Sequence, residues 1–210
     1  MLAAILLLAA PPWLLRLQGE GWAPWEGWVL AAASAPVAGV LVSSVGLGRS
    51  LAASAVGAVL AALSGAGAAG ASSVACVAAW LGLWSAGCHL LLQGAGTGRA
   101  SVCACVLWGS MMLPVPWGRA LDAMQRNAPG AFRMTRWVLA ASAAVQVDRS
   151  GGGDPIHRPW LYRLGYGDYL LGRPPGAWWL PSAVLAAGLV SRAIRRTSPA
   201  SRAGRAPPVS

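Results

Sequence analysis

The sequence contains no lysine and few acidic residues. All 16 basic residues of the 210-residue chain are therefore arginines, and with 6 acids they give a formal net charge of +10. Only 10% of the residues are charged, whereas about 25% are charged in a typical soluble domain. So few charges cannot cover the surface of a soluble globule. The 56% of hydrophobic residues also exclude an intrinsically disordered chain.

These absences limit the chemistry of the chain. A P-loop needs a lysine directly after its glycines, so the chain cannot form one. All six acids lie outside the long apolar stretches of the chain. An ion-coupled carrier would need an acidic proton relay within them, so this class of transporter is disfavoured. The aspartates show no paired or metal-loop spacing. We therefore expect no enzyme activity, no cofactor and no metal, and any ATP hydrolysis must come from a partner chain.

Stretches without charged side chains indicate membrane-spanning helices. The longest runs from residue 50 to residue 98, and its Gly/Ala/Ser-rich middle, residues 64–73, predicts a turn. A helix needs about 20 apolar residues to cross a hydrocarbon core of ~30 Å. The predicted fold is therefore all-α, a polytopic transmembrane bundle with about six spans. The predicted spans are residues 1–17, 27–48, 50–67, 73–93, 100–117 and 176–193.

The first predicted span differs from the others. Pro11 and Pro12 are expected to break its helix or to confine the regular part to ten residues. It lacks a basic start, so it is a poor secretory signal. The sequence leaves open whether Met1 is the biological start.

The arginines predict the orientation of the bundle. With six spans both termini share one side, which then holds Arg49, Arg99 and the Arg-rich tail, without any acid. This is the positive-inside pattern. Tryptophans fall near the opposite face, as interfacial rings prefer; they are Trp22, Trp25, Trp28, Trp117, Trp178 and Trp179. We therefore predict a multi-pass inner-membrane protein with both termini cytoplasmic. Its basic tail, residues 195–210, is expected to be disordered and near anionic lipid, and we expect no nucleic-acid partner.

Residues 119–175 form a predicted extracytoplasmic segment between spans 1–5, within residues 1–118, and the last span, residues 176–194. We expect short helices over residues 118–127 and 134–147. The uncharged part of the second is about 11 residues, which suits a re-entrant or interfacial helix. Long connections are usually functional, and the candidate gate consists of Arg133, Arg136 and Trp137.

Cysteine and histidine within the predicted spans allow two interpretations. The cysteines at positions 76, 88, 103 and 105 are expected to pack as small hydrophobes. A metal site, or a membrane Cys/His enzyme using Cys88, His89 and Arg99, would need helices to converge, because adjacent residues of one helix point about 100° apart. His89 is a candidate functional polar group, since an intramembrane His is often functional. The alternative is a simple hydrogen bond to a neighbouring helix.

Small residues form two parallel rows on one predicted helix. One row holds Ser54, Ala58, Ala62 and Ala66, and the other holds Gly57, Ala61 and Gly65. Small residues allow close helix approach in lipid. The rows could pack within one chain or between two copies.

The order of these features resembles the permeases of ABC-2 type ABC transporters. The similar stretches are residues 33–50, which end VLVSSVGLGR before Ser50, residues 91–100, and the Arg-rich close at 179–196. The resemblance implies a permease subunit of an exporter, driven by separate ATP-binding subunits and paired with itself or with another permease. It also implies a coupling loop at Gly46, Gly48 and Arg49, with Arg99 beside it. The chain departs from the family in lacking an amphipathic helix before the first span. A non-transporting membrane anchor or scaffold is the alternative function.

Overall fold

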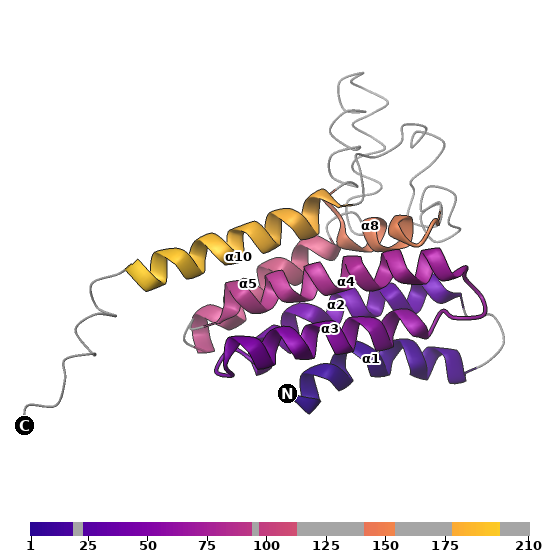
Figure 1. The fold of residues 1–210 in the computed structure, drawn as a ribbon, viewed down its shortest axis with the longest axis horizontal. Coiled ribbons are helices and arrows are strands. Elements are labelled where there is room, and N and C mark those ends of the chain that lie inside the picture. Colours follow the sequence, from indigo (N-terminus) through magenta and orange to yellow (C-terminus); the bar gives the residue numbers. More distant parts are fainter. Residues whose placement is uncertain (19–22, 94–96, 113–140, 154–177, 198–210) are drawn as a thin grey trace, which may run out of the picture.

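The computed structural model describes residues 1–18, 23–93, 97–112, 141–153 and 178–197 (Figure 1). These residues form seven helices and no strand, which confirms the all-α prediction. The helices are α1 (Leu2–Leu17), α2 (Pro24–Leu41), α3 (Leu47–Leu63), α4 (Ala71–Leu92), α5 (Thr97–Met112), α8 (Ala143–Ser150) and α10 (Trp179–Thr197). The turn predicted over residues 64–73 is also confirmed, because α3 ends at Leu63 and α4 begins at Ala71.

The first four helices form a closed four-helix bundle. α1 packs against α2 and α3, and α4 packs against the same two helices. α5 lies beside α2 and α4, α8 contacts the same pair, and α10 runs along α4 (Figure 1). We call the end with the α2–α3 turn, residues 42–46, the inner end. The end with the α3–α4 turn, residues 64–70, is the outer end.

Tryptophan and alanine fill the centre of the bundle. Trp80 and Trp84 are completely buried and stack with ring centroids 5.8 Å apart. Ala58 and Ala61 of the small-residue rows are buried, and a Cβ on Gly57 would lie 2.7 Å from Leu8 Cδ1 of α1. The rows therefore pack within one chain, so a dimer along this face would require α3 to separate from its neighbours.

A side chain of α4 supplies the hydrogen bond that a proline inside α2 cannot donate. Pro36 has no N–H, so the carbonyl of Ala32, four residues earlier, loses its helical hydrogen bond. The indole Nε1 of Trp84 donates to this carbonyl over 2.9 Å. The buried backbone oxygen is thus satisfied by tertiary structure.

The prediction that prolines break the first helix is wrong. α1 is continuous from Leu2 to Leu17 and contains Pro11 and Pro12. Helix α1 is packed against both α2 and α3, and Pro12 is itself buried. We attribute the continuity to this tertiary packing, which offsets the lost backbone bonds.

The predicted helix ends are shifted in several places. The second helix begins at Pro24, where a proline is favoured in the first turn, and ends at Leu41 instead of residue 48. Arg49, expected in a loop, belongs to the first turn of α3. Among the described helices, α4 alone is both long and apolar enough to cross a membrane, while α1 and α3 are apolar but shorter. The structure thus shows a helical bundle without establishing six spans.

The helix predicted over residues 134–147 is not continuous. Ser142 has an extended backbone (φ −78°, ψ 120°), and α8 begins only at Ala143. α8 packs against α2 and α4, and Ala143 and Val147 are fully buried there. The part of this helix before residue 141 lies outside the described residues, as do residues 118–127 and the tail 198–210.

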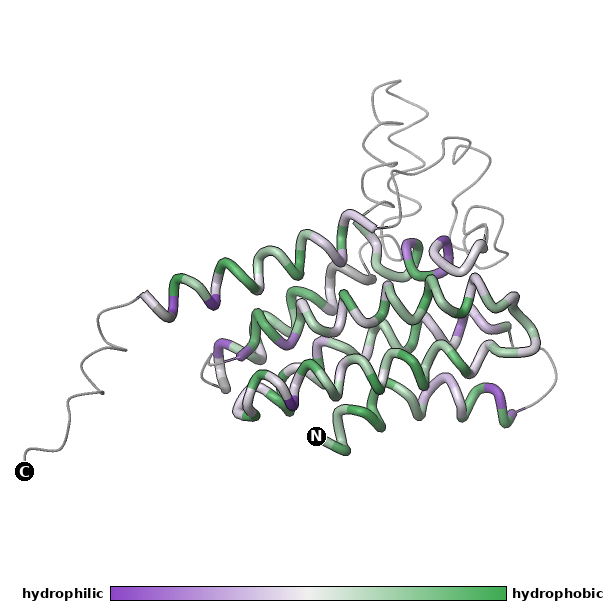
Figure 2. The backbone as a smooth tube through the Cα atoms, in the orientation of Figure 1, coloured by the Kyte–Doolittle hydropathy of each residue, from purple (hydrophilic) through white to green (hydrophobic). Residues whose placement is uncertain are grey.

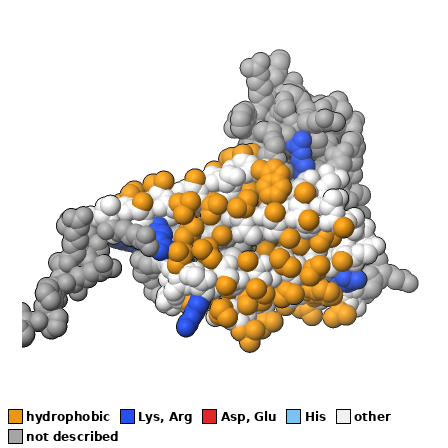
Figure 3. Space-filling model, viewed as in Figure 1, with side chains coloured by type: hydrophobic (Ala, Val, Ile, Leu, Met, Phe, Trp, Pro, Cys, Tyr) orange, Lys and Arg blue, Asp and Glu red, His pale blue; other side chains and the backbone are white. Residues whose placement is uncertain are grey.

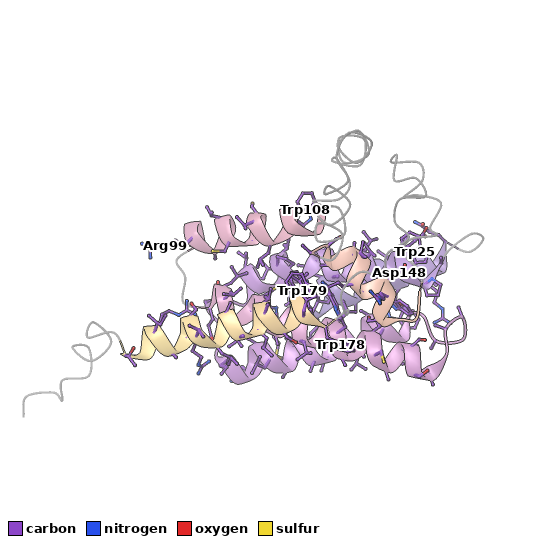
Figure 4. The ribbon with its side chains drawn as sticks, turned by 90° about the horizontal axis from the view of Figure 1, so that it is seen from above. Trp25, Arg99, Trp108, Asp148, Trp178 and Trp179 are labelled. Carbon is purple, nitrogen blue, oxygen red and sulfur yellow. The ribbon has the colours of Figure 1, made fainter. Side chains whose placement is uncertain are left out.

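The last helix is displaced toward the inner end. A Cβ on Gly87 would meet Leu185, and a Cβ on Gly188 would meet Leu90. Residue numbers therefore increase in the same direction along both helices, so α4 and α10 are parallel. Extended backward, this register places Trp179 opposite the middle of α4 (Figure 4). Trp178 and Trp179 therefore lie beside the middle of α4 and not at the outer end of the bundle, where α8 contacts α2 and α4.

Candidate functional site at the inner end of the bundle

His89 is held inside the bundle by two serines of α3. Its side chain is 2% exposed, and its Nδ1 lies 2.6 Å from the Ser54 hydroxyl and 3.2 Å from the Ser50 carbonyl. The Ser54 hydroxyl also donates to the Ser50 carbonyl over 3.1 Å. Because a carbonyl can only accept, we assign the proton to Nδ1. The sequence alternative of a His bonded to a neighbouring helix is therefore what the structure shows.

The other nitrogen of His89 has no hydrogen-bond partner among the described residues, although it is buried. With the proton on Nδ1, Nε2 presents a lone pair. The ring edge beside it faces α2, where a Cβ on Gly39 would come within 3.2 Å of His89 Cδ2. The hydroxyl of Ser85, one turn earlier on α4, is likewise buried without a partner. Such unpaired buried atoms are uncommon in proteins.

Ser50 connects this group to the α2–α3 turn. Its buried hydroxyl lies 3.4 Å from each of the carbonyls of Val42, Val45 and Gly46. One hydroxyl can donate to only one of these oxygens at a time. Ser50 therefore holds the turn against the first residues of α3 through a shared proton.

Gln93 links the same turn to the last helix. Its Nε2 donates to the Val45 carbonyl over 3.2 Å, and its Oε1 accepts from Arg192 Nη1 of α10, also over 3.2 Å. Arg195 Nη2 donates to the Leu90 carbonyl over 3.0 Å, which satisfies an oxygen in the last turn of α4. These two hydrogen bonds of Gln93 connect Val45 of the α2–α3 turn, the end of α4 and Arg192 of α10. We call this connection the Gln93 bridge.

The predicted coupling residues lie next to this bridge. Gly46 precedes α3, while Gly48 and Arg49 occupy its first turn and are exposed. A Cβ on Gly46 or Gly48 would meet nothing within 4 Å, so this surface is open. Arg99 is exposed in the first turn of α5 at the same end (Figure 4).

The candidate gate lies outside the part of the chain that the structure describes. Arg133, Arg136 and Trp137 lie outside the described residues. The geometry does not support the membrane Cys/His enzyme that Cys88, His89 and Arg99 suggested. Cys88 is fully buried in the core, whereas its neighbour His89 bonds to α3 and Arg99 is exposed.

The remaining cysteines do not converge on His89. Cys76, Cys103 and Cys105 are exposed and unpaired by disulfides. Within the described residues, no three His, Cys, Asp or Glu side chains are grouped so that they could hold a metal.

Sequence reasoning missed most of the polar partners at the inner end. The sequence pattern places Ser54 only in a packing row. It places Gln93 and Arg192 at the ends of predicted spans and Arg195 in the basic tail. The available signal was helical spacing, because Ser50 and Ser54, like Ser85 and His89, are four residues apart and share a face. The partner across the bundle could not be identified from spacing alone. No family model, curated protein or solved structure matches the chain.

Proposed function

We propose that the chain is an integral membrane protein that lies with its bundle axis across the bilayer. Large apolar side chains are exposed along its flanks, while charged residues gather at the two ends (Figures 2 and 3). Monomeric soluble proteins rarely expose large contiguous apolar patches. The exposed residues include Val56, Val59 and Leu63 of α3, Val102, Val106 and Trp108 of α5, and Leu189, Val190 and Ile194 of α10.

Within the membrane, the proposed activity is that of a permease subunit of an ABC-type exporter. The observation that carries it is the Gln93 bridge, which connects the exposed turn before Arg49 to α10. A separate ATP-binding subunit would contact this turn from the cytoplasm. Displacement of the turn would then act on Arg192 and move α10 along α4, in the manner of a rigid packed element.

The translocation pathway of such a permease would lie between two subunits. The described bundle is filled by Trp80 and Trp84 and by buried alanines, which leaves no room for a substrate at its centre. Homo- or heterodimerisation with a second permease would create the pathway at an exposed flank. The segment with Arg133, Arg136 and Trp137 is the proposed outer gate.

The same filled core favours the second candidate function, a non-transporting anchor or scaffold of a membrane complex. A scaffold needs a rigid bundle and a binding end, but no pathway. The two functions differ in their dependence on ATP, because a scaffold would not respond to nucleotide hydrolysis by a partner.

Co-purification of the tagged chain from native membranes tests the permease proposal. We expect an ATP-binding subunit to associate with the wild-type chain and to be lost in Arg49→Glu, because the reversed charge lies on the exposed first turn of α3. Arg205→Glu is the matched charge control and should retain the subunit. Absence of any ATPase from the wild-type complex, together with transport that ATP never changes, would contradict the proposal and favour the scaffold.

A further inference from the structure

An apolar groove of about 450 Å³ runs along the outer half of the bundle between α3 and α4. Val59 and Leu63 form one wall, and Val74, Ala75 and Ala78 form the other, with the α3–α4 turn closing the outer end. The volume falls within the range of ligand sites, ~300–1,000 Å³. Counted from Ala71, which also lines the groove, to Ala78, the α4 wall extends about two helical turns, ~11 Å. This length fits within the ~15 Å hydrocarbon depth of one bilayer leaflet.

A cationic side chain of α1 lies beside the end of α3, next to one wall residue of the groove. Arg16 Nη1 donates to the Ser64 carbonyl over 2.9 Å and to the carbonyl of the wall residue Leu63 over 3.4 Å. The guanidinium lies 5.2 Å from the centre of the Trp13 ring and is exposed. Its remaining N–H groups are therefore accessible at the outer end of α3, next to the wall residue Leu63.

The beginning of α4 adds favourable partial charge at the same end. Its N-cap residue, Gly70, supplies no side-chain hydrogen bond to the first turn. The turn between Arg16's acceptors and Gly70 is compact, since Ala69 N–H donates to the Gly65 carbonyl over 2.9 Å. An uncapped helix N-terminus and an arginine both attract a phosphate group, so the groove is complementary to an anionic amphiphile.

We propose that this groove holds one acyl chain of an anionic phospholipid from the outer leaflet, with its phosphate beside Arg16. The proposal rests on the membrane location proposed above. The walls offer only aliphatic side chains, which suits a flexible hydrocarbon chain, and the half-bilayer depth suits one leaflet.

Photo-crosslinking in lipid nanodiscs tests the site with the full-length chain. The probes are phosphatidylglycerol and phosphatidylcholine, each with a diazirine-bearing acyl chain, and labelled residues are mapped by mass spectrometry. We expect phosphatidylglycerol to label peptides containing Leu63 and Val74 about tenfold more than phosphatidylcholine, equivalent to about 1.4 kcal/mol. Arg16→Gln should remove this preference.

Two tryptophan variants separate groove occupancy from general lipid contact. Ala75→Trp fills the groove and should abolish its labelling, while Ala79→Trp, exposed on α4 but not part of the groove, should leave it unchanged. Equal labelling by both lipids, or full labelling in Ala75→Trp, would overturn the lipid site while leaving the membrane location intact. Failure of the wild-type chain to float with vesicles would instead overturn the membrane location and the lipid site together.

Discussion

At the scale of single residues, side chains donate hydrogen bonds to backbone carbonyls that lack a helical N–H partner. Pro36 removes the donor for the Ala32 carbonyl, and Trp84 replaces it from another helix. At the outer end, Trp13 Nε1 donates to the Leu60 carbonyl over 2.9 Å, next to the Arg16 bonds. Long aromatic and cationic side chains thus donate to carbonyls beside Pro36 and at the end of α3, where helical backbone donors are missing.

Replacement of Trp84 by Phe tests this compensation. The variant keeps an aromatic ring in the core but leaves the buried Ala32 carbonyl unpaired, so we expect a loss of about 1–2 kcal/mol of unfolding free energy. Denaturant unfolding in detergent micelles measures the change. Trp108→Phe, at an exposed position of α5, is the control and should change stability little.

A second substitution tests whether the stability lost in Trp84→Phe can be restored. Pro36→Ala restores a backbone N–H that can donate to Ala32 within α2. In the Pro36→Ala background, Trp84→Phe should therefore cost clearly less than in the wild type. An identical cost in both backgrounds would show that the indole acts through packing alone.

At the scale of elements, the sequence predicted which segments are helical but not how they are placed. Charge-free stretches located α1 to α5 and α10, because charges are excluded from the apolar centre of a bundle. The same stretches could not reveal that α10 begins opposite the middle of α4. That displacement depends on the close approach of Gly87 and Gly188 and on the contact of α8 with the outer part of α4, which are tertiary contacts.

Of the polar site around His89, the sequence could identify the histidine but not its partners. His89 could be singled out because it is isolated in a 49-residue stretch without charge. Helical spacing puts Ser50 and Ser54 on one face of α3, but spacing does not show that they and Gln93 meet His89 and the α2–α3 turn. Their role follows only from the packing of α3, α4 and α10 against one another.

The α4–α10 contact predicts a strong effect of enlarging Gly188. Its Cβ would lie 2.7 Å from Leu90 Cβ and 3.1 Å from the Gly87 carbonyl oxygen, so Gly188→Val must push the two helices apart. We expect destabilisation of about 1–3 kcal/mol and weaker crosslinking between cysteines introduced at Gln93 and Arg192. Gly109→Val, where a Cβ would meet nothing within 4 Å, is the matched control. Equal crosslinking in both variants would contradict the helix register described here.

At the scale of the whole molecule, the described charges divide unequally between the two ends. The inner end carries five described arginines and no described acid, whereas the arginines of the outer end, Arg16 and Arg149, are balanced by Glu26 and Asp148. The five are Arg49, Arg99, Arg192, Arg195 and Arg196. Only positive residues in short loops orient a membrane protein effectively. The asymmetry therefore predicts that the inner end faces the cytoplasm, independently of the proposed transport activity.

Reporter fusions at two positions test this orientation. Gly152 follows α8 and packs near Ser73 at the outer end, since a Cβ there would lie 3.4 Å from the Ser73 hydroxyl. A reporter inserted after Gly153 should therefore be extracytoplasmic, and one fused after Arg205 should be cytoplasmic. The double variant Arg49→Glu/Arg99→Glu should reduce the cytoplasmic fraction of the second fusion, because it removes two of the five described inner arginines and adds two acids. Both wild-type reporters on one side would exclude an odd number of membrane crossings between the two sites, and with it the six-span arrangement.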